Sequence, residues 1–138
     1  NPKFSEKNEC ENGAYIVKMT SHDNKVTLIA SGSEVELALN VHNALKENNI
    51  ESKVVSMPCQ ELFDKQSDDF KRNILDKESL IVTIEAGNVS SWKKYLGGKG
   101  ISLGIDRFGE SAPYKKVYEH FDLSVEKIVN TIQKQLRK

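Results

Sequence analysis

The stretch from Val26 to Asn48 constrains the fold most, because it joins a buried-strand pattern to a helix pattern through a tight turn. Val26–Ala30 is a run of apolar and β-branched residues, typical of a strand covered on both faces. Ser31-Gly32-Ser33 interrupts this run, and apolar residues then recur with helical spacing at Leu37, Val41, Ala44 and Leu45. A single apolar stripe must be buried. The stretch therefore predicts a helix packed on a sheet.

The turn between strand and helix has two interpretations. Ser33, followed three residues later by Glu36, matches a capping box, in which the serine hydroxyl accepts a hydrogen bond from the start of the helix. A glycine turn before a helix can also bind phosphate. Glu34 and Glu36 would repel an anion, and the turn has one glycine where the dinucleotide fingerprint has three. We favour a structural cap, and an anion site is the open alternative.

Length and charge exclude several classes of protein. A chain of 138 residues fits one domain with its own core. Lys plus Arg and Asp plus Glu both number 20, so no net charge favours nucleic acid or an anionic membrane. No apolar run approaches a membrane span, and the N-terminus lacks the pattern of a signal peptide. We expect a cytoplasmic protein without nucleic-acid or membrane partners.

The cysteines and histidines do not form a recognisable metal or catalytic pattern. Cys10 and Cys59 have no second ligand at zinc spacing, so free thiols are expected. The three histidines are interpreted as surface or boundary residues rather than as ligands or bases; they are His22, His42 and His120.

The remaining patterns predict a three-layer α/β/α domain. Residues 1–12 are polar and aperiodic, which indicates a linker, and the domain is expected to span residues 13–138. Further strands are predicted at 14–17, 52–57, 80–84 and 101–105, and further helices near 60–66, from Ser67, from Ser90 or Ser91, from Ser111 and from Ser124. Four strands alternating with helices give a mostly parallel sheet. The first strand adds a fifth, and pairing with the Val26 strand across so short a connection would make it an antiparallel edge strand.

The carboxyl ends of parallel strands share one edge of a sheet, which is the default place for a pocket. Carboxylates there can act as an acid and base pair, or can anchor backbone N–H groups of the glycine turns. We prefer the anchoring role and assign no catalytic, cofactor-binding or metal residue. The candidate residues for this strand-end pocket are Ser31, Ser33, Glu85, Arg107, Glu110 and Ser111.

Several segments together resemble the C-terminal domain of transketolase. The resemblance extends from residue 13 onward and rests on the order and spacing of the segments as well as on their residues. They are Asn12–Val17, Ile29–Ala38, Val54–Pro58, Phe63–Gln66, Ile84–Gly87 and Phe108–Pro113.

The resemblance implies a part of a transferase rather than a complete one. Transketolases transfer a two-carbon ketol unit between phosphosugars of the pentose phosphate pathway, using thiamine diphosphate and Mg²⁺ (or Ca²⁺), which the family's upstream domains bind. The implied partners of this chain are those upstream domains and a second copy in a homodimer, and the implied role is a structural and dimer-interface module. The alternative is a small-ligand regulatory module that uses the strand-end pocket. A hydrolase would need a paired nucleophile and base, and the sequence shows no such pair.

Overall fold

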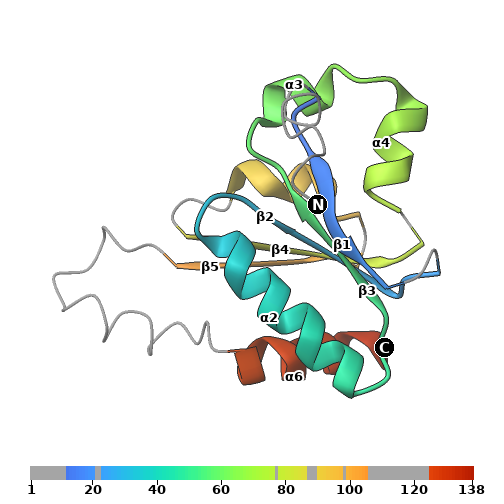
Figure 1. Ribbon diagram of the computed structural model, residues 1–138, viewed down its shortest axis with the longest axis vertical. Coiled ribbons are helices and arrows are strands. Elements are labelled where there is room, and N and C mark those ends of the chain that lie inside the picture. The colour runs from blue at the N-terminus through green and yellow to red at the C-terminus, as the bar shows by residue number, and fades with distance from the viewer. Residues whose placement is uncertain (1–11, 21–22, 77, 87–89, 98, 106–124) are drawn as a thin grey trace, which may run out of the picture.

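The computed structural model describes residues 12–20, 23–76, 78–86, 90–97, 99–105 and 125–138, as ten helices and strands. Figure 1 shows them as a sheet between two layers of helices. In chain order they are β1 (Tyr15–Met19), β2 (Val26–Ala30), α2 (Glu34–Glu47), β3 (Ser52–Ser56), α3 (Gln60–Asp64), α4 (Asp68–Ile74), β4 (Leu80–Ala86), the 3₁₀ helix η1 (Ser90–Tyr95), β5 (Ile101–Ile105) and α6 (Val125–Leu136).

The sheet has the strand order β1-β3-β2-β4-β5. The pairs β3–β2, β2–β4 and β4–β5 are parallel, whereas β1 is antiparallel to β3 and lies at the edge of the sheet. The predicted fold class, with one antiparallel edge strand, is therefore confirmed. The partner differs from the one considered on the sequence, because β1 reaches past β2 and pairs with β3 across a register shift between Ile16 and Lys18.

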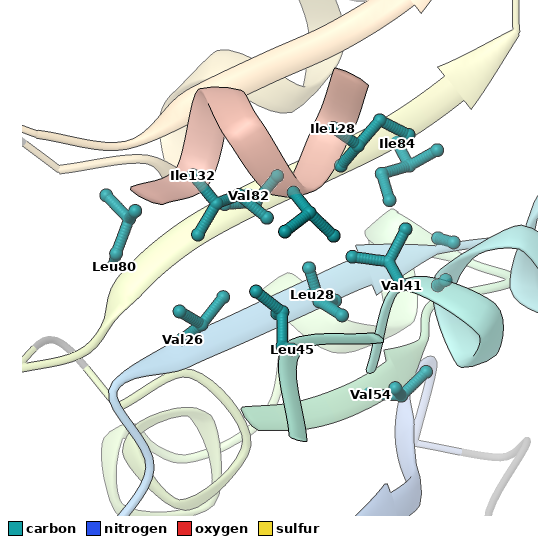
Figure 2. Close-up of a cluster of buried hydrophobic side chains, with 13 residues drawn as sticks. Val26, Leu28, Val41, Leu45, Val54, Leu80, Val82, Ile84, Ile128 and Ile132 are labelled. Carbon is teal, nitrogen blue, oxygen red and sulfur yellow. The ribbon is translucent and has the colours of Figure 1, made fainter. Parts of the chain in front are cut away.

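Helices α2 and α6 cover one face of the sheet (Figure 1) and bury an aliphatic core there. Alternate residues of the strands point to this face, as the period of two in a strand requires. Figure 2 shows side chains of β2 and β4 facing Val41 and Leu45 of α2 and Ile128 and Ile132 of α6. The buried members of this core are Val26, Leu28, Ala30, Ala38, Val41, Leu45, Val54, Leu80, Val82, Ile84, Ile128, Val129 and Ile132.

The other face of the sheet lies under α3, α4 and η1, and its core contains aromatic residues. Phe63 of α3 is 1% exposed, and its ring centroid lies 5.7 Å from that of Tyr95 and 6.2 Å from that of Phe70. The strands contribute residues that alternate with those of the first core. The buried members are Ala14, Ile29, Val55, Met57, Phe63, Ile74, Leu75, Ile81 and Trp92.

Two predicted helix caps have different outcomes. Ser67 has an extended backbone and accepts a hydrogen bond from the Phe70 N–H at 3.1 Å, so the start of α4 is confirmed. The capping box at Ser33 is wrong. Ser33 has helical backbone angles (φ −69°, ψ −19°), and its side chain caps no N–H in the described part of the chain; its hydroxyl donates to Glu34 Oε2 at 3.3 Å instead.

The predicted helix from Ser111 and the cap at Ser124 lie outside the described residues, whereas α6 itself is present. Among the residues that the structure describes, no helix is both long enough and apolar enough to span a membrane.

Candidate functional site

The strand carboxyl ends bring two predicted site residues together. Ser31 follows β2, Glu85 lies near the end of the neighbouring strand β4, and the Ser31 hydroxyl donates to Glu85 Oε2 at 2.8 Å. Both side chains are half-buried. Ser33 is exposed and contacts Glu34. Arg107, Glu110 and Ser111 lie outside the described residues.

The turn after β2 is closed by its own backbone. Gly32 has φ +59°, a value that suits glycine. The N–H groups of Glu34 and Val35 donate to the carbonyls of Ser31 and Gly32, both at 3.2 Å. Glu34, which is 9% exposed, places a carboxylate in the first turn of α2. Occupied N–H groups and a buried carboxylate disfavour an anion site at this turn.

A serine and a histidine form a buried pair that the sequence did not reveal. His42 Nδ1 lies 2.7 Å from Ser52 Oγ, and the two side chains are 2% and 0% exposed. His42 is therefore a core residue, and its interpretation as a surface or boundary residue was wrong. Burial lowers the pKa of His42, the charges of Lys18 and Lys46 lower it further, and a hydrogen bond to the Ser52 backbone opposes them.

The sequence showed no nucleophile paired with a base, but the structure brings Ser52 and His42 together. Ser52 and His42 have the residue types of a nucleophile and a general base, and their distance suits proton transfer. Both residues are buried between α2 and β3, so the serine is not exposed to a substrate. The pair joins the helix to the sheet.

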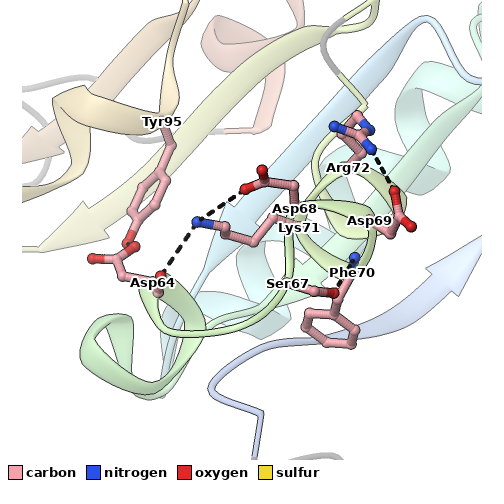
Figure 3. Close-up of polar contacts among 8 residues, drawn as sticks. All are labelled: Asp64, Ser67, Asp68, Asp69, Phe70, Lys71, Arg72 and Tyr95. Atoms are coloured by element: carbon pink, nitrogen blue, oxygen red, sulfur yellow. Dashed lines mark hydrogen bonds and ion pairs between the residues drawn. The ribbon is translucent and has the colours of Figure 1, made fainter.

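Asp64, at the end of α3, is the centre of a polar cluster that ties three short helices together. Lys94 donates to its Oδ2 at 2.7 Å and the Tyr95 hydroxyl to its Oδ1 at 2.9 Å. Figure 3 shows Lys71 of α4 directed at the Asp64 backbone carbonyl, which accepts from its amine at 3.2 Å. Two ion pairs in α4 lie beside it, Lys71–Asp68 and Arg72–Asp69.

The contacts of Asp64 shift two pKa values away from neutral pH. Burial would raise the pKa of Asp64, but hydrogen bonds from Lys94 and Tyr95 outweigh it and hold the pKa below its usual value. Burial, together with the bond to Asp64, raises the pKa of Tyr95. Neither group titrates where a general acid or base works. The cluster therefore has a structural role: it connects α3, α4 and η1.

One cavity among the described residues lies at the amino ends of the parallel strands, opposite to the predicted pocket. It has a volume of about 1260 Å³ and is lined at the amino ends of strands by residues before β2, at the start of β4 and before β5. Residues of α3, α4, η1 and α6 complete the lining. Ser31, Ser33 and Glu85, the predicted pocket residues that the structure describes, do not line this cavity.

Among the described residues, no group of three His, Cys, Asp or Glu side chains is placed to hold a metal ion. Cys59 is a free thiol, as expected. Within the described part of the chain, several polar groups with catalytic chemistry are engaged with one another, in the pairs Ser31–Glu85, His42–Ser52 and Asp64–Tyr95. Such an arrangement stabilises a fold.

Comparison with known proteins gives a consistent result. Residues 13–124 match the family model of the transketolase-like TK C-terminal domain. The chain is similar to transketolase of Aquifex aeolicus, with 34% identity over 131 residues, 94% of this chain and 19% of that protein. It is similar to the chloroplastic transketolase of Solanum tuberosum, with 42% identity over 120 residues, 85% of this chain and 16% of that protein.

The same similarity is found in three dimensions. The crystal structure of transketolase from Campylobacter jejuni superimposes with a TM-score of 0.79 at 39% identity, covering 91% of this chain and 19% of that one. The chain thus spans about a fifth of the length of these relatives.

Proposed function

Because this chain belongs to the family of transketolase C-terminal domains, we propose that it is the C-terminal domain of a transferase that moves a two-carbon ketol unit between phosphosugars. In that enzyme, thiamine diphosphate and Mg²⁺ (or Ca²⁺) are bound by upstream domains, and this domain contributes structure and part of a homodimer interface. It supplies no catalytic, cofactor or metal-binding residue. The domain proper begins at residue 13, after a linker, and the enzyme is cytoplasmic.

This proposal rests on one observation: side chains with reactive groups are hydrogen-bonded to one another. His42 and Ser52 satisfy each other inside the core, and Ser31 and Glu85 satisfy each other at the strand ends. A catalytic group needs access to substrate and a pKa suited to proton transfer. Buried or mutually bonded groups lack that access, which favours the structural role over the alternative of a regulatory module at the strand ends.

The start of the domain has its own support. Gly13 packs so closely on α3 that an added Cβ would lie 2.3 Å from the Phe63 nitrogen and 2.4 Å from the Cys59 carbonyl. The Cys59 N–H donates to the Gly13 carbonyl at 3.2 Å. Residue 13 is therefore part of the packed domain.

A domain exchange tests the proposed role. The C-terminal domain of the Campylobacter jejuni transketolase is either removed or replaced by residues 13–138 of this chain. The truncated protein should lose dimerisation and ketol transfer, and the hybrid should recover both. Ser31→Ala and Glu85→Gln in the hybrid should leave kcat within about twofold, because neither residue takes part in the chemistry. A truncated enzyme that remains dimeric and active contradicts the interface role.

The isolated 138-residue chain provides the second half of the test. Calorimetric titration with thiamine diphosphate and Mg²⁺ should give no binding heat, and a ketose-to-aldose transfer assay should match the blank. Circular dichroism shows whether the protein in these assays is folded. Micromolar binding by the folded chain would place cofactor contacts in this domain.

A further inference from the structure

The turn before β1 contains two neighbouring residues, Asn12 and Gly13, that can react with each other. The backbone nitrogen of a residue can attack the side-chain amide carbon of a preceding asparagine, which closes a five-membered imide and releases ammonia. Glycine favours this reaction, because it has no Cβ to hinder the approach of its nitrogen. Asn12-Gly13 is the only Asn-Gly pair in the sequence, and Asn12 is half-buried, so part of its surface is accessible to water.

The fold requires glycine at position 13. Its φ is +87°, a value that residues with a side chain rarely adopt, and an added Cβ would lie 2.3 Å from the Phe63 nitrogen. Any larger residue at this position would overlap the backbone of α3. Packing therefore retains the residue that makes Asn12 reactive.

The Gly13 nitrogen carries no hydrogen bond that the reaction would have to break. Within the described ranges its N–H donates to no other residue, whereas the carbonyl of the same residue accepts from the Cys59 N–H at 3.2 Å. An N–H engaged as a donor must first lose its bond, so the barrier to attack rises by about the free energy of that bond. The carbonyl of Gly13 is therefore held in place, and its nitrogen is available.

Five of the other described asparagines precede nitrogens that are hydrogen-bonded. Four of them lie in α2, α4 and α6, where the following N–H bonds along the helix. The fifth is Asn24, which is 8% exposed and is followed by Lys25, whose N–H donates to the Glu51 carbonyl at 2.9 Å. The four helical residues are Asn40, Asn43, Asn73 and Asn130.

The turn after α2 shows that exposure alone does not select the reactive asparagine. Asn48 and Asn49 are both exposed, more so than Asn12. The N–H that follows Asn48 donates to the Lys46 carbonyl at 3.0 Å, and the N–H that follows Asn49 donates to the Leu45 carbonyl at 2.9 Å. Among the described asparagines, Asn12 alone combines partial exposure with an unbonded nitrogen on the next residue.

We propose that Asn12 is a site of spontaneous deamidation. Hydroxide removes the proton from the Gly13 nitrogen, and this nitrogen bonds to Asn12 Cγ. The Cγ–Nδ2 bond breaks, and the side-chain nitrogen takes a proton from water and leaves as ammonia. A water molecule then opens the imide at either carbonyl and leaves aspartate or isoaspartate at position 12.

Both products change the junction between the linker and the domain. Each adds one negative charge to a chain whose basic and acidic residues both number 20. Isoaspartate also inserts one carbon into the backbone directly before Gly13, where the packed domain begins. The proposal does not depend on the function proposed for the domain.

Prolonged incubation of the folded 138-residue chain tests the site. Ion-exchange chromatography should show an acidic species that accumulates with time, and mass spectrometry of its peptides should place the replacement of NH₂ by OH at Asn12. The rate should rise with pH, because the attacking species is the deprotonated Gly13 nitrogen. In Asn12→Gln the species should be absent, since a glutamine would have to close a six-membered ring, which forms much more slowly.

Asn49→Gly provides a matched control in the same chain. It creates a second Asn-Gly pair at an exposed position whose φ of +63° suits glycine, and the nitrogen after Asn48 remains bonded to the Lys46 carbonyl. In the folded variant, Asn12 should deamidate about tenfold faster than Asn48, the effect of one hydrogen bond on a rate. In concentrated urea, where that bond is lost, the two rates should become similar.

Three outcomes overturn the proposal. The first is the absence of modification at Asn12 in folded protein. The second is accumulation of the acidic species at the same rate in Asn12→Gln as in the unchanged protein, which would place the reaction at another residue. The third is an equal rate at Asn12 and Asn48 in folded Asn49→Gly, which would mean that hydrogen bonding of the attacking nitrogen does not select the site.

Discussion

The two faces of the sheet are covered in different ways. One carries α2 and α6, of 14 and 12 residues, and the core beneath them is aliphatic. The other carries α3, α4 and η1, of five, seven and six residues, over an aromatic core with a polar cluster around Asp64. Figures 2 and 3 show the two kinds of packing.

Helix length accounts for the difference. A helix of three to four turns presents several apolar residues to the sheet, and their burial holds it in place. A helix of one or two turns presents only one or two such residues, so large rings and side-chain hydrogen bonds between elements supply the remaining stabilisation. The face under α2 and α6 should therefore depend on volume, and the other face on specific contacts.

The largest effect is expected at Gly13, which packs closely against the backbone of α3. Gly13→Ala should destabilise the protein by about 3–5 kcal/mol, because φ is +87° and the new Cβ would overlap the backbone of Cys59 and Phe63. Urea denaturation measures the change. Gly32→Ala is the control: φ is +59° but no atom lies within 4 Å of the added Cβ, so the cost should be only about 1 kcal/mol. Equal costs for the two variants would contradict the close packing at residue 13.

On the aliphatic face, Leu45→Ala should cost about 2–5 kcal/mol, since Leu45 is 0% exposed and the cavity left behind adds to the lost burial. Leu62→Ala is the control, because Leu62 is 38% exposed and its truncation should change the free energy of unfolding by less than about 1 kcal/mol. A small cost at Leu45 would show that this face collapses to fill the space.

Tyr95→Phe separates hydrogen bonding from volume on the aromatic face. The ring stays and only the hydroxyl bond to Asp64 is lost, so the expected cost is about 1–1.5 kcal/mol. The pKa of Asp64 should rise in the variant, because the Tyr95 hydroxyl is one of the donors that lower it. Side-chain carboxyl NMR follows this titration. An unchanged pKa of Asp64 would show that the Tyr95 hydroxyl does not contribute to lowering it.

Ser67→Ala should cost about 1 kcal/mol through loss of the cap on α4. Ser33→Ala, the matched substitution before α2, should have almost no effect, because the backbone closes that turn. Thermal unfolding of the two variants measures both values. A loss at Ser33 as large as that at Ser67 would restore the capping box that the sequence predicted.

The effect expected at His42 is a pH dependence of stability, which appears on acidification. The folded-state pKa of His42 lies below its unfolded value of about 6.5, so the unfolded state binds the proton more readily. Its contribution to stability is complete above pH 6.5 and is lost as the pH falls from there towards the folded-state pKa. Denaturation midpoints between pH 8 and pH 5 should fall less steeply in His42→Gln than in the unchanged protein. Parallel curves would contradict this role.

Local patterns were sufficient for most of the fold. The stripe of α6 and the continuous apolar runs of β2 and β4 predicted element type and layer order, because side-chain period and burial are linked within a few residues. Residues 13–138 also carried a family resemblance that the comparisons confirmed. At the candidate site, sheet topology was enough to bring Ser31 and Glu85 to one edge.

Only the tertiary structure decided which distant residues meet. The sequence by itself predicted an antiparallel edge strand at β1, but not that it pairs with β3. It showed a serine before a helix, but not that Ser33 would adopt helical backbone angles and leave the helix start uncapped by its side chain. Packing brings His42 to Ser52 across 10 residues of sequence, and Asp64 to Tyr95 across 31. Such contacts depend on the relative placement of whole elements, which local periodicity does not encode.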